Sequence, residues 1–405
     1  MNPPAANASH FKKLSVLIAV AFVDMVGLMI VVPLLPFIAT DLGADPVMIG
    51  RMIAAFSIAQ LLSAPLWGRV SDRYGRRPAL LIGLTASTVA YVVFGLAHTI
   101  WLLFLSRLVQ GAGGGTTGVL NAYVADTIEP AERAKALGWI SAATSAGVVI
   151  GPAIGSAAAH FGAAAPGIFA ALLCATNAFF AWRWLPESKS AHTGSQERKP
   201  VWHAAWEVLR HPGGRVNALI WIYAGGMLAF TCLTAILALL LKDEFAITER
   251  TVGWIYSYIG VLSVVIRGVA LGPAIRFFGE LRGMRIGMLI LITGLLCYPA
   301  AQHFWQLLLI IPLVPIGTAL VFPTTTSLIS RYSNPSETGL VMGVAQTYGG
   351  IARAVAPIIA TFVYQTISHG APFYLGAGLV ALVGLIAVRL EPAPVAGPTP
   401  LGDRA

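Results

Sequence analysis

Long apolar stretches separated by short polar interruptions make up most of this 405-residue chain. Each stretch holds roughly twenty residues, which is the length that an α-helix needs to cross the hydrocarbon core of a bilayer, about 30 Å thick. The stretches are continuous rather than alternating, so they favour helices over the strands of a membrane β-barrel. The pattern predicts twelve transmembrane helices, at residues 14–39, 47–70, 79–97, 99–125, 136–159, 166–185, 215–241, 251–277, 285–302, 304–330, 338–366 and 372–390.

The polar segments between these stretches repeat at a nearly fixed distance. The loop Gly68–Pro78 has a weaker copy at Gly272–Arg282, 204 residues later, and Pro152 has a counterpart in Pro357, 205 residues later. Parallel repeats of six helices build one large class of secondary transporters, whose substrate sites lie at the repeat interface near the bilayer midplane. We therefore predict an all-α membrane protein with twelve transmembrane helices in two pseudo-symmetric six-helix bundles.

The longest polar interruption divides the two halves. We expect an N-terminal bundle at residues 1–185, a cytoplasmic linker at 186–214, a C-terminal bundle at 215–390 and a disordered tail at 391–405 that is rich in Pro and Gly. Within the linker, Trp202, His203, Trp206 and Val208 suit either a short amphipathic helix at the membrane interface or a partly ordered connection.

Composition places the chain in lipid, because 57% of its residues are hydrophobic, only 11% are charged and the mean hydropathy is +0.77. Loops rich in Lys and Arg stay in the cytoplasm. Cytoplasmic N- and C-termini put 20 of the 26 Lys and Arg residues on that side. The net charge of +9 thus reflects membrane topology and gives no indication of nucleic-acid binding. The short loops suit a multi-pass protein of the bacterial inner (plasma) membrane.

Cofactor chemistry has no visible basis in the sequence. Cys174, Cys232 and Cys297 fall inside predicted helices without the spacing of metal ligands. The glycine run 111–115 lacks the lysine of a phosphate-binding loop. We therefore expect no enzyme activity, no metal and no cofactor.

Asp24 is the only acidic residue near the middle of a predicted span. A charge at that depth costs about 2.5 to 3.5 kcal/mol on insertion scales and indicates a functional site. Arg107 stands at a similar depth in the fourth span, so we expect the two side chains to pair. A balanced pair of this kind can take up and release a proton as water access changes, whereas a static ion pair that only fixes helix packing is the alternative.

Two further arginines, Arg267 and Arg353, have no acidic partner inside the second half. If they face a shared cavity, they favour anionic or zwitterionic substrates, because guanidinium binds carboxylate and phosphate in a bidentate manner. The alternative is that Arg267 extends to the cytoplasmic surface and that Arg353 binds helix carbonyls.

Small residues mark one face of the fifth span, where Gly147, Gly151 and Gly155 recur every four residues beside Pro152. Such a face permits close helix packing. It either serves ordinary packing or moves against the other half during transport, with the proline easing a bend.

Polar and aromatic residues at mid-span depth are the candidates for substrate contact, since aromatic rings combine apolar area with a polar handle. They suit a mostly apolar site for amphipathic compounds. These candidates are Phe56, Gln60, Asn121, Tyr223, Phe230, Tyr256, Gln346 and Tyr348, together with Arg353.

Four motifs resemble one known family. The loop GRVSDRYGRRP at residues 68–78 resembles the signature between helices 2 and 3 of the major facilitator superfamily. Residues 24–36, 106–111 and 147–155 resemble the helix 1, helix 4 and helix 5 motifs of its twelve-helix drug:proton antiporter branch, which includes the tetracycline exporters. The second-half copy of the loop departs from the signature at Pro273 and Ala274.

The signature loop is the predicted gate. Gly68 and Gly75 permit tight backbone approach, and Arg73 and Arg76 keep this end cytoplasmic. The resemblance implies that Asp72 contacts the start of helix 11, near Ser336. We further expect Arg76 to pair with Asp126 at the end of helix 4, so that these contacts hold the two halves together on the cytoplasmic side.

These observations and the resemblance predict a proton-coupled antiporter that exports amphipathic organic compounds or drugs by alternating access, working as a monomer in the lipid bilayer. Two alternatives stay open. One is a transporter of organic anions or lysolipids that uses Arg267 and Arg353, and the other is a non-transporting receptor or channel on the same scaffold.

Overall fold

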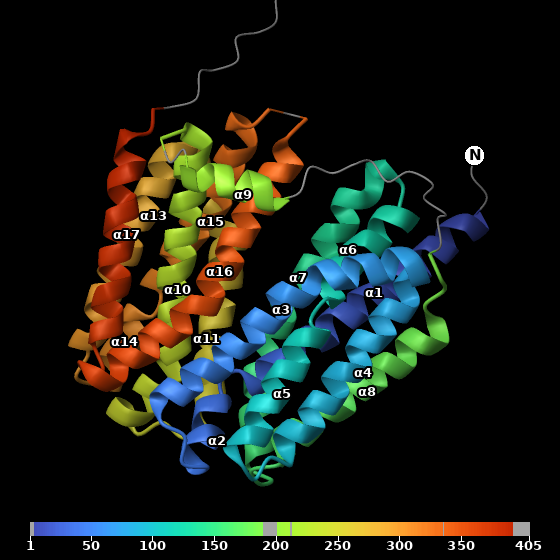
Figure 1. Cartoon of the computed structure of the whole chain (residues 1–405), viewed down its shortest axis with the longest axis horizontal. Helices are drawn as coiled ribbons and strands as arrows, with labels where there is room; N and C mark the ends of the chain where they lie inside the picture. The colour runs from blue at the N-terminus through green and yellow to red at the C-terminus, as the bar shows by residue number, and fades with distance from the viewer. Residues whose placement is uncertain (1–3, 189–200, 211–212, 335, 392–405) are drawn as a thin grey trace, which may run out of the picture.

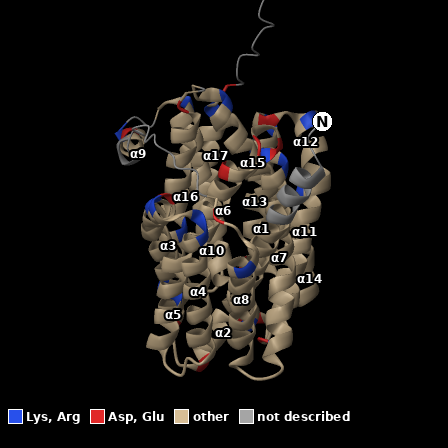
Figure 2. Ribbon diagram, turned by 90° about the vertical axis from the view of Figure 1, so that its right-hand side faces the viewer, with Lys and Arg blue, Asp and Glu red and all other residues tan. Residues whose placement is uncertain are grey.

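The structure is a computed structural model that describes residues 4–188, 201–210, 213–334 and 336–391. Within these ranges every regular element is a helix. The helices form two bundles, which lean against each other at the end that carries α2 and diverge toward the end that carries α9 (Figure 1). Charged residues gather at the two ends of the molecule and are sparse along its middle (Figure 2), as expected for a body whose middle lies in lipid.

The first bundle contains eight helices. They are α1 (Pro4–Val31), α2 (Leu35–Asp41), α3 (Pro46–Tyr74), α4 (Arg76–Gly95), α5 (Ile100–Gly113), α6 (Thr116–Thr127), α7 (Pro130–Ala159) and α8 (Ala165–Trp184).

The second bundle follows the linker helix α9 (Val201–Arg210). It contains α10 (Arg215–Phe245), α11 (Val252–Val265), a π-helix (Ile266–Ala270), α12 (Leu271–Phe278), α13 (Glu280–Cys297), a 3₁₀ turn (Tyr298–Ala300), α14 (Phe304–Ile310), α15 (Leu313–Tyr332), α16 (Thr338–Thr366) and α17 (Ala371–Arg389).

Ten helical segments of the described chain are long and apolar enough to cross a membrane, which makes the protein a multi-pass integral membrane protein. The other two predicted spans lie in the broken pair α5 and α6 and in α16, which is more polar because it carries Gln346, Arg353 and Gln365. The count of twelve spans and the cytoplasmic position of both termini stay predictions.

Several predicted spans are interrupted rather than continuous. Proline accounts for two interruptions, because it lacks a backbone N–H and clashes with the preceding turn. Pro33 falls between α1 and α2, and Pro312 falls between α14 and α15. A third interruption has no proline: α5 ends at Gly113 and α6 begins at Thr116.

The contacts between the bundles lie at the end opposite the linker. There the Val47 amide donates a hydrogen bond to Gln365 Oε1 (3.2 Å). The Ser156 hydroxyl donates to the Glu249 carbonyl (2.6 Å), and Lys242 Nζ lies 4.0 Å from Asp41 Oδ1. At the linker end, no hydrogen bond or ion pair joins the two bundles within the described residues. The structure is therefore closed at one end only.

Helix α9 lies on the second bundle near the start of α16. Its Val208 is buried, whereas Trp206 is 56% exposed, so the helix has two unlike faces. The side chains of Trp202 and His203 lie outside the described residues, as does the predicted tail from residue 392 onward.

Arg285 of α13 donates hydrogen bonds to the carbonyls at the end of α17. Arg285 Nε donates to the Ala387 carbonyl (3.1 Å), and its Nη2 donates to the carbonyls of Val388 (3.1 Å) and Leu390 (2.6 Å). The last carbonyls of a helix lack partners within the helix. This side chain of α13 therefore satisfies the exposed end of α17.

Candidate functional site

Asp24 lies in the second half of α1, near the middle of the first predicted span, and is half-buried in the first bundle. Its Oδ2 accepts a hydrogen bond from the Thr116 hydroxyl at 2.9 Å, and Thr116 is the first residue of α6. The Tyr91 phenol of α4 and the Cys174 thiol of α8 lie close enough to interact with it electrostatically. The structure thus surrounds this carboxylate with neutral polar groups from three neighbouring helices.

The predicted ion pair between Asp24 and Arg107 is not formed, and this part of the prediction was wrong for the conformation seen. Arg107 is 2% exposed and its guanidinium lies over the Phe94 ring, 4.9 Å from the ring centre. Its Nη2 atom is buried without a hydrogen-bond partner in the described structure. Similar depth along two helices did not bring the two charges together, because Arg107 points toward α4.

Gln110, one turn after Arg107, completes a buried polar group that sequence reasoning did not single out. Its Nε2 donates to the Tyr91 hydroxyl at 2.8 Å, while its Oε1 is buried without a partner within the described chain. Tyr91 is therefore hydrogen-bonded to Gln110 and lies within electrostatic range of both Asp24 and Arg107. The signal available in the sequence was the four-residue run from Arg107 to Gln110, which places both on neighbouring faces of one helix.

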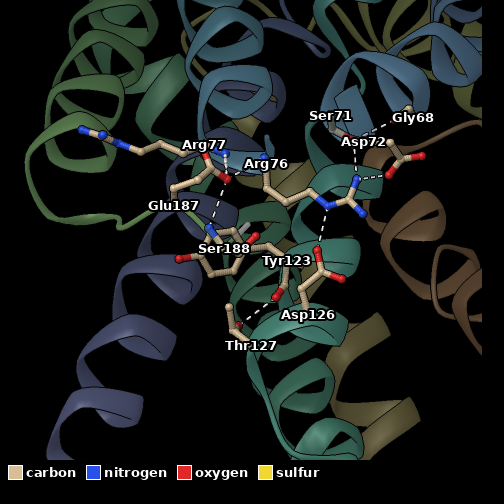
Figure 3. A network of polar contacts seen from close by, with 10 residues as sticks. All are labelled: Gly68, Ser71, Asp72, Arg76, Arg77, Tyr123, Asp126, Thr127, Glu187 and Ser188. Atoms are coloured by element: carbon tan, nitrogen blue, oxygen red, sulfur yellow. Dashed lines mark hydrogen bonds and ion pairs between the residues drawn. The ribbon is translucent and has the colours of Figure 1, made fainter. Parts of the chain in front are cut away.

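The signature loop forms a network of polar contacts at the linker end of the first bundle (Figure 3). Arg76 Nε donates to Asp126 Oδ2 at 2.9 Å, so the structure brings together the two residues that were expected to pair. Arg76 Nη1 also contacts Asp72 and donates to the Ser71 hydroxyl at 2.7 Å. One guanidinium therefore ties the end of α3 to the end of α6.

The predicted contact of Asp72 with the start of the eleventh span, which is α16 in the structure, is absent in this conformation. Asp72 is 68% exposed and its partner is Arg76 in the same bundle. The physical reason is the arrangement of the bundles, which diverge at this end and leave α16 out of reach (Figure 1). Arg73 lies over the Tyr74 ring at 5.4 Å and forms no ion pair within the described residues.

Glu187 is a member of this network that sequence reasoning missed. Its Oε1 accepts from the backbone amides of Arg76 (2.8 Å), Arg77 (3.4 Å) and Ser188 (3.0 Å). Gly75 has a φ of +104°, a conformation suited to glycine, and it brings these amides to face the carboxylate. Glu187 therefore caps α4 from the start of the linker. The only hint in the sequence was a glutamate two residues after the sixth predicted span, which ends at residue 185.

The glycine face of α7 packs within its own bundle. A Cβ on Gly151 would lie 2.6 Å from Met29 Cβ, and one on Gly147 would lie 2.9 Å from Met25 Cβ, both on α1. Gly155 meets the Ile30 carbonyl of α1 in the same way. The adjacent face of α7 meets the other bundle, where the Pro152 carbonyl lies against Gly253 of α11. Close packing on α1 is thus what this face does here, and its movement stays a prediction.

In the second bundle, three aromatic rings gather around α15. Tyr223 and Phe230 of α10 contact the Phe322 ring edge to face, at centroid distances of 5.7 Å and 6.1 Å. The Tyr223 ring and Arg353 Nη1 of α16 both lie beside Gly349, within 2.8 Å and 3.7 Å of where its Cβ would be. The Arg353 guanidinium has no hydrogen bond or carboxylate partner within the described residues, so it does not bind helix carbonyls as one interpretation supposed. Phe322 is the member of this cluster that the sequence did not reveal.

The other substrate candidates do not form one cluster. Phe56 is half-buried on α3, and Gln60 donates to the Gly114 carbonyl at 3.4 Å. Tyr256 is half-buried on α11. Tyr348 is 9% exposed and donates to the Ala205 carbonyl of α9 at 3.0 Å, so it supports the linker helix rather than facing a site. Two others have exposed side chains, Asn121 and Gln346.

Arg267 lies on the π-helix and its side chain is exposed. Arg353 lies on another helix, α16, and no hydrogen bond or ion pair links it to Arg267 within the described chain. No group of three or more His, Cys, Asp or Glu side chains among the described residues has the arrangement of a metal site.

Comparison with known proteins gives consistent results along the whole chain. The family model described as Major Facilitator Superfamily matches residues 17–240 and 219–404. The chain is 28% identical over 387 residues to "Tetracycline resistance protein, class C" of Escherichia coli, covering 93% of this chain and 96% of that protein. It is 28% identical over 380 residues to "Multidrug resistance protein 2" of Bacillus subtilis (strain 168), covering 91% and 92%.

A solved structure is also similar. The human organic anion transporter MFSD10 (TETRAN) matches with a TM-score of 0.68 and 25% sequence identity, covering 95% of this chain and 100% of that chain. The resemblance read from the loop and helix motifs is thus confirmed by both sequence and structure.

Proposed function

Because the chain belongs to the Major Facilitator Superfamily, we propose that it is a proton-coupled antiporter that exports amphipathic organic compounds by alternating access. The family consists of transporters rather than enzymes, and the relatives named above are drug resistance proteins. The bacterial relatives and the basic loops support a place in the bacterial inner membrane, where the protein works as a monomer with both termini in the cytoplasm.

The observation that carries the proton coupling is the position of Asp24. It is the acidic residue at mid-membrane depth, and its hydrogen-bond partner in the described structure is the neutral Thr116 hydroxyl. Such a carboxyl group is costly to keep charged in lipid, at about 2.5 to 3.5 kcal/mol on insertion scales. Its charge therefore depends on whether water reaches it, and that access changes when the bundles rock. Proton uptake from one side and release to the other follow from this alternation.

The two ends of the molecule support alternating access. The end opposite the linker is held by contacts such as Val47 with Gln365, whereas the signature loop is free of the second bundle. In the state that is open at the end opposite the linker, contacts such as Val47 with Gln365 separate. The two bundles then approach at the linker end, where the exposed Asp72 side chain can reach the start of α16. Before that change, Arg76 holds the Asp72 carboxylate at the end of α3 by pairing with both Asp72 and Asp126.

The test is transport into proteoliposomes with an imposed pH gradient, comparing the wild type with Asp24→Asn. We expect Asp24→Asn to abolish uphill transport of a tetracycline-like compound while downhill counterflow continues, because the binding site stays intact and only the proton site is lost. The control is Asp45→Asn, which changes an exposed acidic helix cap. Undiminished uphill transport by Asp24→Asn would remove the assignment.

One observation favours a second candidate, a transporter of organic anions. The Arg353 guanidinium lies near Tyr223 and has no ion-pair partner among the described residues, and the similar human structure is titled an organic anion transporter. In the same liposomes, Arg353→Gln should then reduce the flux of an anionic dye but not of a cationic dye of similar size, whereas Arg267→Gln should leave both unchanged. Equal effects on the two dyes would exclude the anion interpretation.

A further inference from the structure

The fourth predicted span is broken at its centre by two glycines. The Gly114 amide bonds to the Gly111 carbonyl (3.0 Å) and the Gly115 amide bonds to the Gly113 carbonyl (2.9 Å), so the regular α-helical ladder stops there. A break inside a membrane leaves carbonyl groups that need partners from the surrounding protein. The structure supplies those partners from one neighbouring helix, α3.

Three side chains of α3 bind the carbonyls at the break. The Trp67 indole N–H donates to the Ala112 carbonyl at 2.6 Å, and weaker contacts run from Ser63 to the Gly111 carbonyl and from Gln60 to the Gly114 carbonyl, both at 3.4 Å. The Trp67 ring also lies directly on Gly115, where a Cβ atom would come within 2.3 Å of the ring. Trp67 therefore fills the space beside the break and binds its backbone.

The break determines where α6 begins. Thr116 is the first residue of α6, and its hydroxyl donates to Asp24. The start of a helix carries unpaired amides and a partial positive charge, which stabilise an anion nearby. In membrane transporters, half-helices of this kind point their starts at charged groups near the midplane. The α6 start thus occupies the position beside Asp24 that Arg107 was expected to take.

The other groups near Asp24 do not supply this stabilisation. Tyr91 of α4 and Cys174 of α8 are neutral neighbours, and Arg107 of α5 interacts with Tyr91 rather than with Asp24. The α7 face opposite this part of α1 presents Gly147 to Met25. The favourable contacts of the carboxylate anion in this conformation therefore come from the start of α6.

We propose that Trp67 is a positioning residue for the proton site: it holds the break in the fourth span, and so keeps the start of α6 and its Thr116 against the Asp24 carboxylate. This inference rests on the proposed function, since it concerns the same proton site. Trp67 does not contact Asp24 in this arrangement and acts on it through the backbone of residues 112–116.

The test uses two variants, each of which removes one polar group and keeps part of the side chain's apolar bulk. Trp67→Phe retains an aromatic ring without the indole N–H, and Thr116→Val retains the branched side chain without the hydroxyl. Both remove stabilisation of the charged form, so the midpoint of the pH dependence of transport should move upward by about one pH unit for Thr116→Val, and in the same direction for Trp67→Phe. Thr116→Ser should restore the wild-type midpoint. The matched control is Trp101→Phe, whose ring is 72% exposed.

If a variant does not transport, the carboxyl band of Asp24 in infrared difference spectra, assigned with Asp24→Asn, is titrated instead on the purified full chain. A wild-type midpoint for Trp67→Phe would overturn the inference, and so would a wild-type midpoint for Thr116→Val. A shift in Trp101→Phe of the same size would also overturn it, because the effect would then be unspecific. Uphill transport that survives Asp24→Asn would instead contradict the proposed function, so the two failures are distinguishable.

Discussion

At the scale of single residues, the first bundle keeps a charged arginine in its core without an acidic partner. Arg107 interacts with the Phe94 ring, and a cation–π contact is worth about 2 kcal/mol when it is removed from water. This offsets most of an insertion cost of about 2.5 to 3.5 kcal/mol. The contact with the Phe94 ring therefore offsets most of the free-energy cost of placing the Arg107 charge in the bundle core. Arg107 also lies within electrostatic range of Tyr91, which is hydrogen-bonded to Gln110.

The charged residues at membrane depth could be found from the sequence, but their partners could not. Asp24 and Arg107 stand out because any charge in a long apolar stretch is conspicuous. Their pairing depends on which face of each helix is turned to the other, and the break after Gly113 changes that geometry. Thr116 and Gln110 carry no charge, so nothing in the hydrophobic pattern distinguishes them from ordinary packing residues.

The cap formed by Glu187 gives a prediction at this scale. Glu187→Ala should lower the stability of the first bundle by about 1 kcal/mol, because the amides of Arg76 and Arg77 lose their acceptor. In a thermal melt of purified protein this corresponds to a fall of about 2 °C in Tm. The control is Glu391→Ala, which removes an exposed ion pair with Arg215 and should change Tm little. An equal fall in both variants would show that Glu187 has no capping role.

At the scale of elements, the interruptions of helices determine the chemistry of the bundles. Those at Pro33 and Pro312 follow from proline, although the spans 14–39 and 304–330 were predicted as continuous. The interruption at Gly114 and Gly115 was not visible in the sequence, because the same glycines also suit a continuous helix that packs closely. The π-helix that carries Arg267 is likewise invisible, since one extra residue per turn leaves no compositional trace. Helix positions were thus predictable, whereas their internal breaks depend on neighbours such as Trp67.

A matched pair of glycines on α7 tests the packing of that element. Gly151→Ala should destabilise the protein by about 1 to 3 kcal/mol, because its new methyl group overpacks the contact with Met29. Gly138→Ala on the same helix meets no atom within 4 Å and should stabilise it slightly, by up to about 1 kcal/mol. Thermal melts in detergent compare the two. If both variants behave alike, the close approach of α7 to α1 does not contribute to stability.

At the scale of the whole molecule, the two bundles touch at one end through few polar contacts and several close backbone approaches. A Cβ on Gly50 would lie 2.0 Å from the Thr361 hydroxyl and 2.6 Å from the Pro357 carbonyl, so α3 and α16 approach closely there with the small Thr361 side chain between them. Contacts made by small residues can be broken and remade without displacing bulky groups. This supports the proposal that the bundles separate at this end during transport.

Cross-linking across this end tests the whole-molecule motion. Val47→Cys with Gln365→Cys, joined by a short bifunctional thiol reagent, should abolish transport by holding the closed end closed. Cys297→Ser in the background removes the native cysteine that is not fully buried, and each single cysteine variant serves as a control. Transport that continues after complete cross-linking would contradict a mechanism in which this end opens.

The clamp formed by Arg285 has a practical consequence for work on this protein. Because a side chain from α13 donates to carbonyls at the end of α17 and to the Leu390 carbonyl directly after it, the last helix is anchored by another helix up to Leu390. A fluorescent reporter or affinity handle joined after Glu391 would leave helix termination unchanged. The carboxyl-terminal side of the molecule is therefore the natural place to attach a label for following expression and assembly.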